Sequence, residues 1–279
     1  MMQRYAASVQ YQGTRYYGWQ IQGHLPTIAK ALNQAISRVA HHAVAVCCAG
    51  RTDKGVHAVS QIIHFDSGSK RSLHAWRSGI NRYLPDDIGM DWIVPVDAGF
   101  HARFSAVARR YVYVICCAPV RPALLHQQVF WTHHHLDAAS MHQAAQVLQG
   151  EHDFTSFRAR ECQSTTARRN IHHISVYRNA VQQYSQQLSQ QQWLVVDVIA
   201  NAFLHHMVRT IVGSLLEIGR NRKPMEWLAQ VLAARDRAQA GENAPPHGLY
   251  LKAVRYADVY ALPGQTGFSH SENTVHMCV

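Results

Sequence analysis

The sequence predicts an α/β protein in which sheets pack on helices, arranged as two comparable halves. Three observations support this. Segments with a two-residue hydrophobic period alternate with segments of helical period along the chain. The alternation occurs twice, although no residue-level repeat is visible. Finally, 47% of the 279 residues are hydrophobic and 16% are charged, so the chain can bury a large core and is too apolar to be disordered.

The first half is expected to contain four strands and two helices. A strand is expected where Tyr5, Ala7, Val9 and Tyr11 alternate with smaller or polar neighbours. A helix is expected over residues 28–39, after the start signal Pro26-Thr27. Residues 44–66 are typical of two strands joined by a glycine-flanked turn at 50–55. A helix near residues 73–84 and a strand near 90–96 complete this half.

The second half repeats the alternation loosely. Strands are expected at residues 110–117, 171–177, 193–199 and 249–259, and helices at 136–149, 201–219 and 224–234. The helix at 201–219 is the longest, with one hydrophobic stripe formed by Phe203, Met207, Ile211, Leu215 and Ile218. We therefore expect domains at residues 1–105 and 106–263, followed by a flexible, polar tail at 264–279. The Gln-rich residues 182–192 are expected to form a long hairpin loop.

We expect neither a membrane-spanning nor a secreted protein. It has no window of about eighteen uninterrupted apolar residues, and residues 1–11 lack the apolar core of a secretory signal. Six cysteines, including the adjacent pairs Cys47-Cys48 and Cys116-Cys117, show no C-x-x-C spacing, so we expect reduced, mostly buried thiols in a cytoplasmic protein. The tract at His133-His134-His135 is not expected to bind metal, because consecutive side chains on an extended segment point to alternating faces.

Positive charge is concentrated in segments that lack acids. The chain has 27 Lys and Arg against 17 Asp and Glu, a formal net charge of +10. Residues 1–52, 98–136 and 162–196 contain basic residues but neither Asp nor Glu. Such segments favour a polyanionic partner, because basic groups displace counterions from phosphates. The alternative is a basic face that serves only solubility.

The candidate chemistry lies in one motif, GRTDKGVHA at residues 50–58. Two glycines bracket a tight turn and let a substrate approach the backbone. Asp53 is the first carboxylate of the chain and stands between Arg51 and Lys54, whose charges favour its ionised form, as a nucleophile or general base requires. An ordinary polar turn with a surface salt bridge to Lys54 explains the same spacing, so both interpretations stand at this point.

The same motif, followed by VSQIIHFD, resembles the active-site segment of tRNA pseudouridine synthases of the TruA type. Further resemblances follow in the same order: FHARFSAVARRYVY, GEHDFTSF, NAFLHHMVRTIVGSLLEIG and GLYL, at residues 100–113, 150–157, 201–219 and 248–251. Together they span residues 3–263. The resemblance implies an α/β (α+β) fold of two similar ferredoxin-like or RRM-like halves. Their sheets would be largely antiparallel and flanked by helices, with an active-site cleft between the halves.

By this resemblance, Asp53 is the catalytic aspartate, and the reaction converts uridine to pseudouridine at positions 38, 39 or 40 of the tRNA anticodon stem-loop. The bond between base and sugar breaks, the uracil turns, and C5 bonds to C1′. The carboxylate can attack C1′, attack C6 or abstract a ribose proton, and the sequence leaves these routes open. No redox change or group transfer occurs, so neither a cofactor nor a metal is expected. The sequence has no dinucleotide fingerprint, P-loop or H-E-x-x-H motif.

Three further residues match active-site positions of the family. Tyr111 matches the tyrosine that lies against the target base, where an aromatic face can hold a flipped base as it turns. Plain core packing is the alternative for this tyrosine, and Tyr113 serves as a packing comparison. Arg209 matches the basic residue that pairs with the catalytic aspartate. Arg51 matches an arginine implicated in RNA contact and base extrusion.

The resemblance also assigns RNA contacts to His101, Arg103 and Phe104 in HARF, and to Arg168 and Arg169 in STTARRN. Ala167 stands where the family often has Pro, which loosens that segment. Arg71, just before the helix at Leu73, is a further phosphate candidate or a solvated charge. The family is homodimeric, with one tRNA lying across both subunits. No membrane or small-molecule cofactor is expected.

Two rival functions stay open at the level of sequence. A non-catalytic RNA-binding or chaperone protein on the same scaffold predicts RNA binding that survives loss of Asp53. A nucleoside hydrolase or glycosylase predicts release of free uracil, and the lack of an Asp-rich metal or ribose site argues against it. The motifs favour the isomerase.

Overall fold

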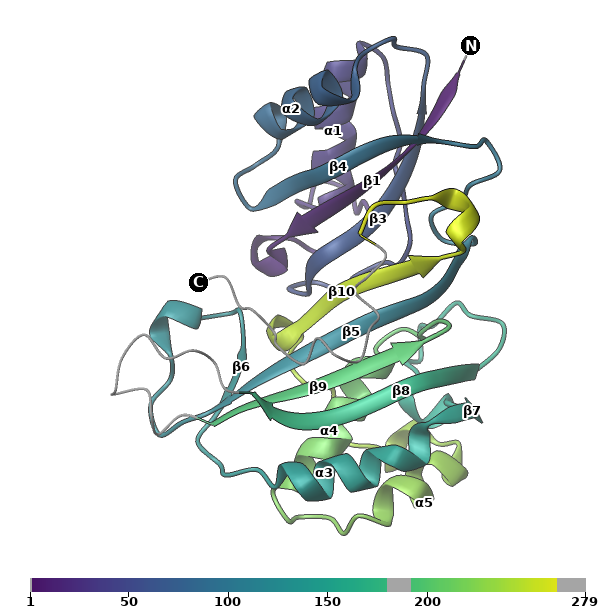
Figure 1. Cartoon of the computed structure of the whole chain (residues 1–279). Helices are drawn as coiled ribbons and strands as arrows, with labels where there is room; N and C mark the ends of the chain where they lie inside the picture. The colour runs from purple at the N-terminus through teal and green to yellow at the C-terminus, as the bar shows by residue number, and fades with distance from the viewer. Residues whose placement is uncertain (1, 180–191, 265–279) are drawn as a thin grey trace. The chain divides into compact units, whose positions relative to one another are not determined.

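The computed structural model describes residues 2–179 and 192–264 (Figure 1). Among these residues two compact units are present: residues 2–109 with 250–264, and residues 110–179 with 192–249. The chain thus returns to unit 1 near its end, whereas the sequence suggests halves that are contiguous. Those expected halves, 1–105 and 106–263, stay a prediction.

Unit 1 is a sheet with two helices on one side (Figure 1). Its strands lie in the order β4-β1-β3-β10, and β2 also pairs with β3. The β1–β3, β1–β4 and β2–β3 pairs are antiparallel, and β10 runs parallel to β3. The order β4-β1-β3-β2, with a helix after β1 and another after β3, is the split β-α-β arrangement of ferredoxin-like folds. The elements are β1 (Gln3–Tyr11), α1 (Ile28–Ala40), β2 (Cys47–Cys48), β3 (His57–Ser67), α2 (Leu73–Tyr83), β4 (Ile88–Val96) and β10 (Leu249–Tyr256).

The core of unit 1 lies between the helices and the sheet. Helix α1 turns a buried stripe inward, as the helical spacing of its hydrophobic residues predicts: Ile28, Leu32, Ile36 and Val39. Helix α2 contributes the fully buried Trp76, whose ring lies 5.5 Å from that of Tyr5 and 5.6 Å from that of Phe65. The Ser72 hydroxyl caps α2 by accepting the Ala75 N–H at 3.1 Å.

In unit 2 the strands pair in the order β5-β9-β8-β7, with β6 parallel to β5. The β7–β8 and β8–β9 pairs are antiparallel, so the expectation of largely antiparallel sheets flanked by helices is confirmed. Every described residue of β9 after its first is buried. Arg110 of β5 forms an ion pair with Asp197 of β9, with side chains only 6% and 4% exposed. The elements are β5 (Ala106–Cys117), β6 (Phe130–Thr132), α3 (Ala138–Ala145), β7 (Gly150–Asp153), β8 (Arg168–Asn179), β9 (Gln192–Ala200), α4 (Met207–Gly219) and α5 (Trp227–Ala234).

Several expected bounds were wrong. Helix α4 begins at Met207 rather than at residue 201, because His206 has a left-handed backbone with φ 63°, which a right-handed helix cannot include. Helix α3 ends at Ala145 and continues as a 3-10 turn, and α5 begins three residues after Pro224. The short strands β6 and β7 were not expected. The Gln-rich segment 182–191 and the tail 265–279 lie outside the described residues. Within the described part of the chain, no helix is long and apolar enough to cross a bilayer.

Candidate active site and nucleic-acid interface

Asp53 lies in the turn that joins β2 to β3, as the sequence predicts. The turn closes with a hydrogen bond in which the Val56 N–H donates to the Asp53 carbonyl at 3.1 Å. Gly55 has φ +78°, a left-handed conformation that costs glycine little. Arg51 and Lys54 are exposed, Thr52 is buried, and Asp53 is half-buried. The turn therefore supports a carboxylate that is partly shielded and reachable.

A second segment, residues 13–19, packs directly against this turn. The Trp19 N–H donates to the Thr52 carbonyl at 2.9 Å. Gly18 has φ +85°, and a Cβ atom there would lie 2.7 Å from the same carbonyl. A Cβ at Gly13 would collide with the carbonyl of Val56. Gly13 and Gly18 thus allow the backbone of residues 13–19 to contact the backbone of the Asp53 turn. The position of the turn therefore depends on a segment more than thirty residues earlier in the sequence.

Lys54 is held by an aromatic ring of that segment. Its Nζ atom lies 4.1 Å from the centroid of the Tyr17 ring, a cation–π contact. Tyr17 is 38% exposed, so the contact lies at the surface beside the turn. The sequence suggested a surface salt bridge as one role for Lys54, and its contact with Tyr17 was not expected.

The predicted RNA-contacting residues His101, Arg103 and Phe104 form one compact loop, called here the HARF loop (residues 101–104). The His101 Nδ1 atom accepts the N–H groups of Arg103 and Phe104 at 3.1 and 3.2 Å. The His101 and Phe104 rings lie 4.4 Å apart, and the Arg103 guanidinium lies 5.6 Å from the Phe104 ring centroid. Phe104 is 77% exposed. A cation beside an exposed ring can contact phosphate and stack on a base.

A buried arginine ties the HARF loop to the base of the Asp53 turn. Arg109, 9% exposed, donates from Nη2 to the carbonyls of Ala49 and Arg103 at 3.1 and 2.6 Å. Its Nη1 atom donates to the Ala106 carbonyl at 3.0 Å. Ala49 directly precedes the turn, so one guanidinium positions the backbone of two predicted functional loops. No local pattern in the sequence indicates this role.

The charges of Arg51 and Arg103 both affect the thiols of Cys47 and Cys48, which precede the Asp53 turn. Burial raises the pKa of the Cys47 thiol, and the charges of Arg103, Arg51 and Arg4 oppose this effect only in part. Burial also raises the pKa of Cys48 to about 12. Both thiols therefore stay protonated near neutral pH, so neither is activated as a nucleophile.

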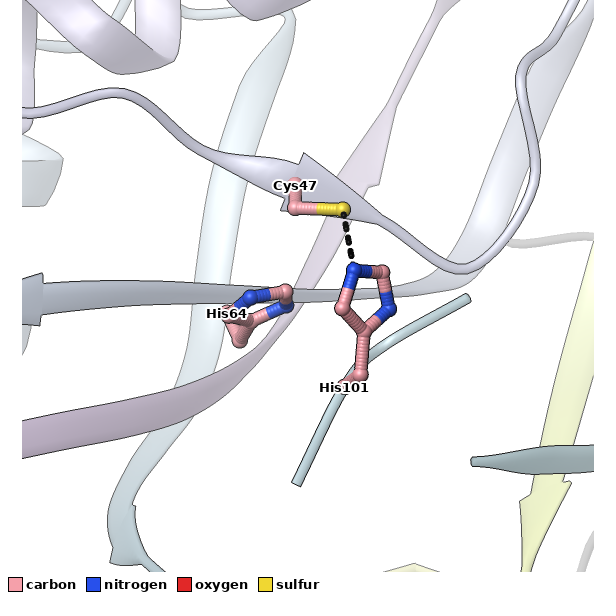
Figure 2. Close-up of side chains that lie close together, drawn as sticks. All are labelled: Cys47, His64 and His101. Carbon is pink, nitrogen blue, oxygen red and sulfur yellow. Dashed lines mark hydrogen bonds between the residues drawn. The ribbon is translucent and has the colours of Figure 1, made fainter. Parts of the chain in front are cut away.

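Cys47, His64 and His101 form a cluster whose ligand atoms lie within 4.8 Å of one another (Figure 2). The His64 Nδ1 atom accepts the Ala102 N–H at 3.1 Å, and the His101 Nδ1 atom also accepts backbone N–H groups. Each neutral ring must then carry its proton on Nε2, and the His101 Nε2–H faces the Cys47 sulfur at 3.7 Å. Metal-bound histidines instead donate their second N–H outward. The hydrogen bonds of this cluster therefore do not fit a metal site.

In unit 2, Tyr111 and Arg209 occupy different elements. Tyr111 on β5 is 8% exposed, and its ring meets that of Phe203 edge to face at 5.1 Å. Tyr113 is fully buried, and its hydroxyl donates to the Pro245 carbonyl at 2.8 Å, which suits its use as a packing comparison. On α4, the Arg209 Nε atom donates to the Ala244 carbonyl at 2.8 Å, and the Ala244 N–H donates back to the Arg209 carbonyl at 2.9 Å. This pair of bonds anchors the start of α4.

Arg168 and Arg169 lie at the start of β8 rather than in a loop. Arg168 is exposed and lies 3.6 Å from the Glu151 carboxylate. The Arg169 guanidinium donates to the Thr166 carbonyl and the Ser164 hydroxyl at 3.0 and 2.6 Å, and burial lowers its pKa. Arg169 thus braces the preceding loop. The exposed Arg71 directly precedes Ser72, the cap of α2.

An α/β fold that presents a carboxylate on a glycine-bracketed turn, beside arginines and an exposed aromatic ring, is typical of an enzyme that acts on nucleic acid. The family model for tRNA pseudouridine synthase matches residues 7–105 and 144–257. The chain belongs to the tRNA pseudouridine synthase family. It is accordingly an isomerase that acts on uridine in tRNA, and the predicted enzyme class is confirmed.

Curated relatives agree with this family. A protein named tRNA pseudouridine synthase A from Shewanella amazonensis is 50% identical over 260 residues, which cover 93% of this chain and 95% of the relative. The protein of the same name from Aeromonas salmonicida is 51% identical over 260 residues, covering 93% of each. A solved structure titled as a Cbf5-Nop10-Gar1 complex shows a TM-score of only 0.27 at 10% identity, covering 76% of this chain and 54% of that one, and carries no weight.

Proposed function

We propose that this chain converts uridine to pseudouridine at positions 38, 39 or 40 of the tRNA anticodon stem-loop, with Asp53 as the catalytic carboxylate. The observation that carries the proposal is the half-buried Asp53 on its glycine-bracketed turn, in a motif that resembles the family's active-site segment. In the reaction the N1–C1′ bond breaks, the uracil turns, and the C5–C1′ bond forms. The proton leaves C5 and N1 gains one, so atoms balance without a cofactor.

Each remaining site residue has a proposed role. Tyr111 stacks on the target base, and its edge contact with Phe203 leaves the ring in a fixed orientation. Arg209 favours the ionised form of the catalytic carboxylate. Arg51 contacts the gap that the extruded nucleotide leaves.

The RNA itself is proposed to bind through its phosphates and one stacking ring. Phe104 is the exposed ring, and Arg103 supplies the adjacent charge. His101 supports Phe104 from one side. Arg71 and Arg168 are exposed and can meet phosphates, whereas Arg169 acts mainly on its own loop. The acid-free segments support a tRNA partner, and a homodimer in the cytoplasm is proposed from the family resemblance.

The test is the pseudouridine content of the anticodon arm after unmodified tRNA is incubated with purified protein, without added cofactor or metal. Wild type should form pseudouridine at positions 38 to 40, and Asp53→Asn should form none while still binding tRNA. Asp86→Asn, an exposed aspartate, is the matched control and should be active. An active Asp53→Asn would overturn the catalytic assignment. Binding without product from folded wild type would favour the non-catalytic RNA-binding protein, and released uracil would indicate a glycosylase.

A further inference from the structure

The strand pairing of β2 ends just before the Asp53 turn, and a side chain continues it. The Ala49 N–H still donates to the Ile62 carbonyl at 2.8 Å. At the next residue, the Gln61 side chain replaces a backbone partner: its Oε1 atom accepts the Gly50 N–H at 3.3 Å, and its Nε2 atom donates to the Gly50 carbonyl at 2.6 Å. Gln61 is 0% exposed. The buried side-chain amide of Gln61 thus binds both the N–H and the carbonyl of Gly50, at the start of the turn.

The same network continues to the residue before Asp53. The Gln61 Nε2 atom also approaches the Tyr11 hydroxyl at 3.5 Å, a long contact. The Tyr11 hydroxyl and the Thr52 hydroxyl share a hydrogen bond of 2.8 Å. Tyr11 is 4% exposed and Thr52 is 6% exposed, so water does not compete freely for these groups. Trp19 binds the Thr52 carbonyl as well. Gly50 and Thr52 are therefore both fixed by groups from other strands.

We propose that Gln61, assisted by Tyr11, is a positioning residue that sets the location of the Asp53 carboxylate. The inference rests on the proposed role of Asp53. A reacting group must be held close to its productive geometry, and a misplacement of about 1 Å can cost about 100-fold in rate. Asp53 is three residues from Gly50 and follows Thr52, so release of either anchor moves the carboxylate. Gln61 need not touch the substrate for this role.

The test uses the full chain with Gln61→Met, which keeps the side-chain length but removes both hydrogen bonds to Gly50. The single-turnover rate at saturating tRNA should fall by about 10- to 100-fold, while the Kd for tRNA stays within about twofold. Tyr11→Phe keeps the ring that packs 6.2 Å from Trp19 and removes only the hydroxyl. It should reduce the same rate by less, and the double variant should lose less than the product of the two single effects.

Asn81→Leu is the matched control. The Asn81 amide binds both backbone groups of Met90, at 2.9 and 2.7 Å, in the same two-bond manner, but on β4, which β1 separates from β3. It should lower the Tm without lowering the single-turnover rate of the folded protein. A wild-type rate in Gln61→Met would overturn the inference, and so would an equal rate loss in Asn81→Leu.

The experiments distinguish failure of the proposed function from failure of the positioning role of Gln61. If Asp53→Asn stays active, the proposed function falls and takes the inference with it. If wild type is active, Asp53→Asn is inactive and the Gln61 variant is fully active, only the positioning role falls. Should Gln61→Met not fold, Tyr11→Phe decides alone, because loss of one hydroxyl leaves no cavity beside the core.

Discussion

His64 is one residue whose protonation links the stability of unit 1 to pH. Burial, and then the neighbouring His101 and Arg4, lowers the pKa of His64 to about 4 from 6.5, although Asp66 opposes the shift. In the unfolded chain this histidine binds a proton below about pH 6.5, whereas in the folded protein it resists protonation until about pH 4. The contribution of His64 to stability is therefore present above pH 6.5 and is lost as the pH falls towards 4.

This linkage predicts a difference between two proteins. The fall in Tm from about pH 7 to about pH 4.5 should be larger for wild type than for His64→Gln, since glutamine has no proton to bind in this range. The glutamine oxygen can still accept the Ala102 N–H that His64 Nδ1 accepts. Thermal melts followed by circular dichroism at several pH values measure both curves. If Tm falls with pH equally in the two proteins, the lowered pKa of His64 is contradicted.

The individual site residues differ in how far sequence could identify them. Asp53, Arg51 and the HARF loop lie in contiguous motifs, so chemistry and resemblance can be read along the chain. Gln61 and Arg109 act on backbone groups of residues 11 and 60 positions away, and the motifs that contain these two residues do not show which backbone groups they bind. The hydrogen bonds of Arg169 within its own loop were equally invisible, because they depend on how that loop folds back.

At the level of elements, the contact between residues 13–19 and the Asp53 turn depends on glycine. Gly18→Ala would place a methyl group 2.7 Å from the Thr52 carbonyl on a backbone with φ +85°. We expect a loss of about 1–3 kcal/mol in stability and a lower single-turnover rate, because the turn must move to make room.

Gly23→Ala provides the control for this prediction. Gly23 also has a positive φ, +49°, but nothing lies within 4 Å of a Cβ built there. The Gly23→Ala variant should therefore lose only the stability that a positive φ costs a non-glycine residue, and it should keep the wild-type single-turnover rate. Urea denaturation and single-turnover assays on the two variants separate the strain from the collision. Equal rates for both would show that the turn adapts to the extra methyl group.

Element types were easier to predict than their ends. The stripe on α1 reflects one face buried against the sheet, which the helical period predicts directly. The alternation in β1 predicted the strand correctly, although both of its faces are buried from Tyr5 to Val9. The start of α4 was misplaced because a four-residue spacing from Phe203 to Met207 continues through a left-handed turn at His206. Strands β6 and β7, of three and four residues, are too short to show a period.

For the whole molecule, the net charge of +10 predicts salt-sensitive tRNA binding. If about 6 to 10 phosphates are contacted, affinity should fall by about 10³- to 10⁵-fold between about 50 and 200 mM salt. Arg103→Gln should reduce the slope of log affinity against log salt by about one unit. Filter binding or fluorescence anisotropy over a salt series measures this slope.

The control for the salt series is an arginine that is not among the residues proposed to contact tRNA. Arg222, which lies 3.6 Å from Glu217, is such a residue, and Arg222→Gln should leave the slope near that of wild type. A slope that does not change in Arg103→Gln would remove Arg103 from the phosphate contacts.

The division into two units includes a long-range strand pairing that the order of residues in the sequence does not reveal. The acid-free segments and the longer helices and strands could be predicted from the sequence, whereas the short strands β6 and β7 could not. The return of β10 to unit 1, where Tyr250 pairs with His57, joins residues almost two hundred positions apart in a parallel register of two residue pairs. No local periodicity encodes such a pairing.

The shared guanidinium of Arg109 also limits how this enzyme can be re-engineered. Because the carbonyls of Ala49 and Arg103 meet the same nitrogen, a loop graft that shifts the backbone of residues 101–104 would pull on the segment that carries Asp53. A chimaera that carries a relative's HARF loop would thus lose catalytic rate as well as change its RNA specificity. Libraries that seek new substrates should vary the side chains of Arg103 and Phe104 and leave the loop length untouched.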